Sequence, residues 1–129
     1  MPITFRYDPE RDLLIHIGVG PVSMADIDSL RQERQEAGVP WPVYHTLSDM
    51  RRATFAFDIA TLKEHEQAVS EEELAGVRQA EIAADPKTTA ILLIWREYLP
   101  EGVLVEIFST VEAAYEWLGV EPRDGDLDP

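Results

Sequence analysis

The sequence predicts an α/β protein in which a single mixed β-sheet of about five strands packs with about four helices. Apolar and polar residues alternate over 3–7 and over 13–19 around a turn-prone segment, which is typical of an antiparallel hairpin. Residues 88–95 are apolar on both parities of a strand, so they predict a central strand buried on both faces. Residues 103–108 predict a last strand that leads into a capped helix.

Helix and strand signals alternate after the hairpin. A Gly-Pro pair at 20–21 interrupts the second strand, and Ser23 begins a helix that ends near Gly38. A third strand is predicted from Val43 to about Ser48. Residues 49–57 are then predicted to form a loop.

A long helical stretch is predicted next. Asp58 caps its start, and helical spacing continues toward Ala84. Ser70 and Glu73 form a capping box inside the stretch, which leaves two alternatives, two helices or one kinked helix. An Asp-Pro pair at 85–86 is predicted to stop it.

The last strand and helix carry their own boundary signals. Ser109 and Glu112 form a capping box, and Gly119 stands where a left-handed cap is expected. Only residues 96–102 separate the predicted central strand from the last one, whereas a parallel crossover needs about a dozen residues or more. The direction of the last strand is therefore left open, and an antiparallel edge is one alternative.

The composition excludes several classes of function. The chain has 129 residues and no cysteine, which excludes thiol catalysis, zinc–thiolate sites and disulfides, and no cofactor is expected. The apolar run at 90–95 is far shorter than the ~20 residues of a membrane-spanning helix. The first residues lack the pattern of a signal peptide, so a cytoplasmic location is predicted.

The charge of the chain is strongly negative. There are 25 acidic and 11 basic residues, with a formal net charge of −14. Such a surface repels the phosphate backbone, so nucleic acid is not an expected partner. The simplest consequence of this charge is solubility through self-repulsion.

The order of these elements resembles the STAS superfamily, and more closely its small, stand-alone SpoIIAA-like bacterial proteins. Two local motifs carry the resemblance. The first is Leu47-Ser48-Asp49-Met50-Arg51 at the end of the third strand, and the second is the strand, hydroxyl cap and helix that contain Ser109, Glu112, Ala113, Ala114, Trp117 and Leu118. The resemblance implies one SpoIIAA-like α/β domain over residues 1–119. Residues 120–129 are acidic with almost nothing to bury, and are predicted to be a disordered tail.

Two departures from that family pattern stand out. Its anti-sigma-factor antagonists carry a phosphorylatable serine after the third strand, whereas this chain has Asp58 and Thr61 in that region, so no phosphorylation switch is expected. Relatives also tend to carry a helix between the last two strands, and here only residues 96–102 remain for it.

Scattered histidines are the only candidates for catalysis. His16 and His45 lie on predicted strands and His65 lies between two glutamates, without a spacing that fixes a second catalytic group. An enzyme would need His45 and Asp49 to converge in a pocket. We therefore expect a protein that is not an enzyme, with no catalytic residues and no metal site.

A ligand cleft is predicted at the carboxyl ends of the third and central strands. Guanidinium groups there would bind a carboxylate or phosphate, and aromatic side chains would cover an apolar tail. The residues of this predicted cleft are Arg51, Arg52, Phe55, Phe57, Trp95, Arg96 and Tyr98. The alternative is that the arginines pair with surface acids and the aromatic residues belong to the core.

The sequence thus favours a small regulatory or protein-interaction module of the SpoIIAA-like type. The alternative is a binder or carrier of an amphiphilic anion such as a fatty acid or a lipid head group. The partner is therefore a protein or a small amphiphilic anion, and the sequence leaves open whether the chain forms a homodimer.

Overall fold

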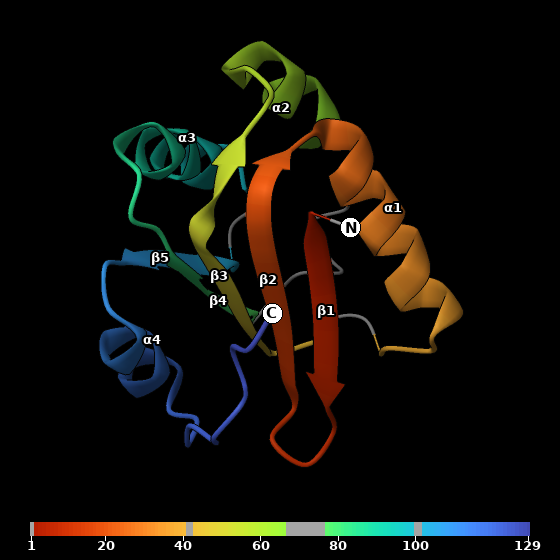
Figure 1. The fold of residues 1–129 in the computed structure, drawn as a ribbon, viewed down its shortest axis with the longest axis vertical. Helices are drawn as coiled ribbons and strands as arrows, with labels where there is room; N and C mark the ends of the chain where they lie inside the picture. The colour runs from red at the N-terminus through yellow and green to blue at the C-terminus, as the bar shows by residue number, and fades with distance from the viewer. Residues whose placement is uncertain (1, 41–42, 67–76, 100–101) are drawn as a thin grey trace.

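The computed structural model describes residues 2–40, 43–66, 77–99 and 102–129, which form one sheet with helices on both faces (Figure 1). This part of the chain holds five strands and four helices, which confirms the predicted fold class. In chain order they are β1 (Ile3–Asp8), β2 (Leu13–Val22), α1 (Met24–Glu36), β3 (His45–Phe55), α2 (Ile59–Glu66), β4 (Arg78–Ile82), α3 (Pro86–Glu97), β5 (Leu104–Phe108) and α4 (Val111–Leu118).

The strands lie in the sheet in their chain order, from β1 at one edge to β5 at the other. β1 and β2 form the predicted antiparallel hairpin, and all later neighbours are parallel. The last strand is therefore a parallel edge strand, so the antiparallel alternative is wrong.

Two apolar clusters cover the two faces of the sheet. On one face, Leu30 of α1, Leu62 of α2 and Ile91 of α3 pack with Met50 and Phe55 of β3. On the other face, helix α4 packs on Leu47, Ala80 and other residues of the sheet, with Tyr115 and Leu118 buried. The three crossover helices thus share one face, and α4 covers the other (Figure 1).

Most of the predicted helix ends are confirmed, with one correction. Ser23 caps α1 in a capping box with Asp26, and the Asp58 carboxylate accepts a hydrogen bond from the Thr61 N–H at 2.8 Å. Gly119 takes the left-handed conformation after α4, with φ 72°. The N-cap of α4 is Thr110 and not Ser109, because the Thr110 hydroxyl accepts from the Ala113 N–H.

The third strand is longer than predicted. β3 continues into the segment 49–57 that was predicted to be a loop, and it ends at Phe55. The pairing of β2 with β3 shifts in register between Ile17 and Val19, where an additional residue of β3 is accommodated. Strict alternation of side chains is lost at that point, which is why the sequence pattern suggested a loop.

Residues 88–95 form most of helix α3 rather than a central strand, so that prediction is wrong. Asp85 is the N-cap and Pro86 occupies the first turn, so the pair that was read as a stop signal is a start signal. Thr88, Ile91 and Leu92 are buried at helical spacing. A short apolar run fits a buried helix as well as a buried strand.

The strand that the sequence analysis missed is β4. It occupies part of the stretch that was predicted to be helical up to Ala84, while the Ser70–Glu73 capping box lies outside the described residues. Helix α3 connects β4 to β5, so the helix between the last two strands is present after all. This connection removes the objection to a parallel last strand.

Residues 120–129 were predicted to be a disordered tail, but in the structure they pack against the hairpin and α4. The Asp126 carboxylate accepts hydrogen bonds from Arg11 at 2.7 and 2.8 Å and from the Tyr115 hydroxyl at 2.6 Å. Arg6 donates to the carbonyl oxygens of Gly125 and Asp126. Leu127 packs against the cluster under α4.

Candidate functional site

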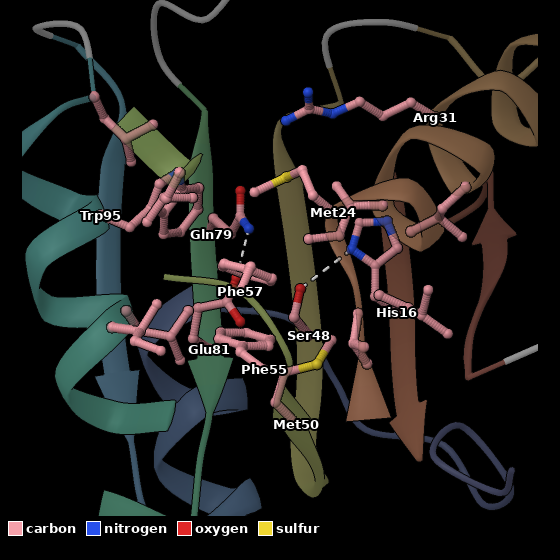
Figure 2. Close-up of a pocket in the computed structure, with 18 of the residues that line it drawn as sticks. His16, Met24, Arg31, Ser48, Met50, Phe55, Phe57, Gln79, Glu81 and Trp95 are labelled. Carbon is pink, nitrogen blue, oxygen red and sulfur yellow. Dashed lines mark hydrogen bonds between the residues drawn. The ribbon is translucent and has the colours of Figure 1, made fainter. Parts of the chain in front are cut away.

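A cavity of about 570 Å³ lies over the sheet between α1 and α3. Its walls are largely apolar, and Figure 2 shows aromatic and sulfur-containing side chains from both sides pointing into it. The apolar lining includes Met24, Leu30, Met50, Phe55, Phe57 and Trp95. A space of this size is within the usual range of small-molecule sites, about 300–1,000 Å³.

A row of polar side chains crosses the floor of this cavity. His16 of β2, Ser48 of β3 and Glu81 of β4 are direct neighbours in the register of three parallel strands. Gln79 lies two residues before Glu81, so it points to the same face of the sheet. We call these four residues the polar row. All four line the cavity (Figure 2).

Hydrogen bonds connect the polar row from one side to the other. His16 Nδ1 and Ser48 Oγ are 3.2 Å apart, and Gln79 Nε2 donates to Glu81 Oε1 at 2.6 Å. Ser48 also forms a side-chain hydrogen bond with Glu81. A row of polar groups inside an apolar cavity is costly unless its members satisfy one another.

Arg34 of α1 sets the direction of these hydrogen bonds. Its Nη1 lies 3.1 Å from His16 Nε2, and a guanidinium can only donate, so Nε2 is the acceptor. The neutral ring then carries its proton on Nδ1 and donates it to Ser48. Burial, followed by the charges of Arg34 and Arg31, lowers the pKa of His16 to about 3, so the ring is neutral at pH 7.

Glu81 is a buried carboxyl that is neutral at pH 7. Burial raises the pKa of Glu81 to about 8, although the hydrogen bonds from Gln79 and Ser48 act in the opposite direction. With Glu81 and His16 both neutral, the charged groups among the described lining residues are the guanidiniums of Arg31 and Arg34. These two guanidiniums are cationic groups that line the cavity, in a chain whose net charge is −14.

The structure brings together only the aromatic part of the predicted cleft. Phe55, Phe57 and Trp95 all line the cavity, and the two phenylalanine rings stack with centroids 5.0 Å apart. Tyr98 follows α3 and is 40% exposed, and it is not among the lining residues.

The three predicted arginines lie outside the cavity, so the prediction of one cleft containing all seven residues is wrong. Arg51 binds the buried Asp49 carboxylate with two hydrogen bonds of 2.7 and 2.8 Å. Arg52 donates to the carbonyl oxygen of Leu127, on the face of the sheet that α4 covers. Arg96 pairs with Glu106 of β5 at 3.5 Å.

The register shift in β3 explains this separation. Ser48 lines the cavity before the shift, Met50 lines it at the shift, and Phe55 lines it after the shift. Strict alternation would place Phe55 on the other face. Arg51 and Arg52 are the exposed pair between Met50 and Phe55. No feature of the sequence alone marks a bulge at this position.

The histidine–carboxylate pair that an enzyme would need is not assembled. His45 Nδ1 lies 3.2 Å from the backbone carbonyl oxygen of Asp12, whereas Asp49 pairs with the arginines beside it. Neither residue lines the cavity. The side chain of His65 lies outside the described part of the chain. Within the described residues, no cluster of three or more His, Cys, Asp or Glu side chains could hold a metal ion.

The sequence analysis missed the residues that define the polar part of the site. Arg31 and Arg34 were unremarkable charges on a helix, and Gln79 and Glu81 lay in a stretch that was predicted to be helical. One signal was present, because Gln79 and Glu81 alternate with Ala80 and Ile82 as in a strand. The alternation could not show that the polar side chains of this strand face a cavity inside the protein instead of solvent.

No protein-family model matches the chain, and no curated protein matches it. Among solved structures, the chain is similar to an uncharacterized protein of the DUF3478 family with a SpoIIAA-like fold, from Shewanella loihica PV-4. The TM-score is 0.62 at 16% sequence identity, over 90% of this chain and 93% of that chain. The likeness confirms the SpoIIAA-like fold. At this identity it shows the fold alone.

The helices of the described residues are short. None of them is long and apolar enough to span a membrane.

Proposed function

We propose that this protein is a non-enzymatic module that binds a small amphiphilic anion in the cavity between α1 and α3. The observation that carries the proposal is the cavity itself, about 570 Å³ with largely apolar walls and two lining arginines. A shared fold does not assign a role, so the proposal rests on this site. A regulatory or protein-interaction role stays a prediction from the sequence.

The charge of the cavity supports an anion as the ligand. Arg31 and Arg34 lie three residues apart on α1 and both line the cavity, whereas Glu81 is neutral at pH 7. Burial and the charge of Arg31 lower the pKa of Arg34 to about 10, which still leaves it protonated at pH 7. Guanidinium groups form strong, charge-assisted hydrogen bonds to carboxylate or phosphate oxygens.

The apolar walls support an aliphatic or aromatic ligand body. Met24 of α1 and Trp95 of α3 face the cavity from opposite sides, and Phe57 lies between them (Figure 2). Burial of apolar surface contributes about 25 cal/mol per Å², so a ten-carbon chain would add several kcal/mol to its affinity. Methionine side chains adapt to the shape of the ligand that they contact.

Decanoate and decan-1-ol are suitable probes because they share a chain and differ in charge. Trp95 fluorescence is read in a Trp41→Phe, Trp117→Phe background, because the chain has three tryptophans and Trp117 packs against Phe108 away from the cavity. We expect a saturable change with decanoate. Calorimetry is expected to give one site per chain.

The charge of the site is tested with two matched arginine variants. Arg31→Gln is expected to weaken decanoate binding at least about fivefold, because one charge-assisted contact is lost. The same variant should leave decan-1-ol within about twofold. Arg96→Gln removes a partly exposed arginine outside the cavity and should change neither affinity. No saturable signal with either probe would contradict the proposed function.

A further inference from the structure

A second cavity adjoins the ligand cavity. It has a volume of about 790 Å³ and lies between α2 and α3, where the chain leaves β3. Met24, Phe57 and Ile91 line both cavities, so the two cavities meet at these three side chains. Figure 2 shows Met24 and Phe57 from the side of the first cavity. An apolar ligand body in the first cavity therefore lies beside the second one.

The second cavity is largely apolar and partly open to solvent. Besides the three shared side chains, its apolar lining consists of Ala56, Ile59, Ala90 and Ile94. Ile59 is 39% exposed, although isoleucine is among the residues most often buried. Apolar side chains that gather on an exposed surface are typical of ligand-binding grooves. The continuity with the first cavity indicates what this groove holds, the far end of the same ligand.

The charges of the two cavities give the ligand its direction. In the second cavity, the Asp58 carboxylate accepts hydrogen bonds from the N–H and the hydroxyl of Thr61, both at 2.8 Å. Lys87, in the exposed first turn of α3, is the cation among the described residues of this lining, and Asp58 offsets its charge. The described lining of the first cavity includes the guanidiniums of Arg31 and Arg34. An anionic group is thus favoured in the first cavity and an uncharged tail in the second.

We propose that the ligand is a long-chain acid such as hexadecanoate, whose carboxylate binds at the arginines of α1 and whose chain passes Phe57 and ends between α2 and α3. This inference rests on the proposed function and names the chemical class of its ligand. The first cavity selects for the charge, and the second cavity selects for the length of the chain.

The first test is a series of acids of increasing chain length. Decanoate, dodecanoate, tetradecanoate and hexadecanoate are measured by equilibrium dialysis, at free concentrations below those at which they aggregate. Each methylene group that is buried strengthens binding about fourfold. The affinity is expected to rise along the whole series, by about a hundredfold or more from decanoate to hexadecanoate. This series needs no variant, so it does not depend on whether a variant folds.

Two neighbouring residues of α3 form a matched pair of variants. Ile94 is half-buried and lines only the second cavity, whereas Leu93 is exposed and lines neither cavity. Ile94→Gln is expected to weaken hexadecanoate binding at least about fivefold and to leave decanoate within about twofold. Leu93→Gln should change neither affinity. Unchanged decanoate binding also shows that each variant is folded.

The direction of the ligand is tested at both ends. Arg31→Gln is expected to weaken hexadecanoate binding at least about fivefold, whereas Lys87→Gln should leave it within about twofold. In NMR spectra, a ¹³C-labelled terminal methyl group of hexadecanoate should contact the methyl groups of Ile59 and Ile94. A loss of affinity in Lys87→Gln but not in Arg31→Gln would reverse the ligand and contradict this inference.

The outcomes separate this inference from the proposed function. If decanoate binds and the affinity stops rising after it, the long-chain inference is wrong while the anion-binding function stands. The same holds if Ile94→Gln binds hexadecanoate as well as the wild type does, because the tail then stays in the first cavity. If no acid of the series binds, both are wrong.

Discussion

Glu81 is a residue whose burial opposes folding. It is 3% exposed, and the attractive groups that contact it are the neutral side chains of Gln79 and Ser48. An unfolded chain releases the Glu81 proton near the usual pKa of 4.5, whereas the folded chain holds it up to about pH 8. Perturbed titratable groups of this kind gather at functional sites, which agrees with the position of Glu81 in the cavity.

The first prediction concerns stability against pH. The folded pKa of Glu81 is raised, so stability is fully present below pH 4.5 and is lost as the pH rises toward 8. His16 has a lowered folded pKa and loses stability only as the pH falls below 6.5. Between pH 6.5 and 8, Glu81→Gln should therefore gain about 2 kcal/mol relative to wild type.

Urea unfolding of both proteins at several pH values measures this difference. The unfolding free energy of Glu81→Gln should depend less on pH than that of the wild type over this range. Parallel curves for the two proteins would show that Glu81 is ionised in the folded protein.

At the scale of the element, the contact between β2 and β3 depends on a glycine. A Cβ atom on Gly18 would lie 2.7 Å from Met50 Sδ and 2.9 Å from Ala53 Cβ. The methionine can move, but the alanine Cβ is fixed to its strand. The close approach lies beside the register shift that turns Phe55 toward the cavity.

The second prediction tests this close approach. Gly18→Ala should lower the unfolding free energy by about 1–3 kcal/mol, because the added methyl group overpacks the strand contact. Ala53→Gly removes the rigid partner atom. In the double variant the cost of Gly18→Ala should shrink, and a double-mutant cycle with no coupling between the two positions would contradict the contact.

The third prediction concerns the packing of helix α4. Leu118 is 3% exposed in the cluster on the face opposite the cavity. Leu118→Ala should cost about 2–5 kcal/mol in urea unfolding, as is usual for a core leucine. Glu116→Ala, on the exposed side of the same helix, is the control. A cost below about half a kcal/mol at Leu118 would show that the helix packs elsewhere.

The elements that the sequence predicted well are those with local signals. The hairpin, α1 and α4 each carry alternation or caps within their own residues, and the structure has them there. The residues of β4 were predicted to be helical and those of α3 to be a strand. An apolar run in α3 resembles a buried strand, and the polar residues in β4 resemble a helix. The aromatic half of the site could be predicted, whereas Arg31 and Glu81 depended on the fold to reach the cavity.

At the scale of the whole molecule, residues 120–129 connect the hairpin to α4. Arg11 and Asp126 have side chains only 10% and 11% exposed, and their ion pair has a distance of 2.7 Å. The Arg11 guanidinium lowers the pKa of Asp126, and the Tyr115 hydroxyl donates to the same carboxylate. Loss of one partner from a largely buried pair is expected to cost about 3–5 kcal/mol.

The fourth prediction is that this segment stabilises the fold. Truncation after Gly119 should lower the melting temperature by about 10 °C or more, since Arg11 and Tyr115 lose their shared partner. Asp126→Ala in the full chain should reproduce most of the loss. Asp124→Asn changes an exposed carboxyl in the same segment and should have little effect. A change of less than about 3 °C on truncation would contradict the docked segment.

The central claim, a ligand cavity between α1 and α3, is tested most directly by methyl NMR of the two methionines that line it. Met24 and Met50 contribute ¹³C-labelled methyl groups to the walls, and Leu118 on the other face provides a control methyl group. We predict that decanoate shifts both methionine resonances with one dissociation constant and gives contacts from its chain protons to both methyl groups. The Leu118 resonances should hardly move. Unshifted Met24 and Met50 resonances at saturating decanoate would contradict the account.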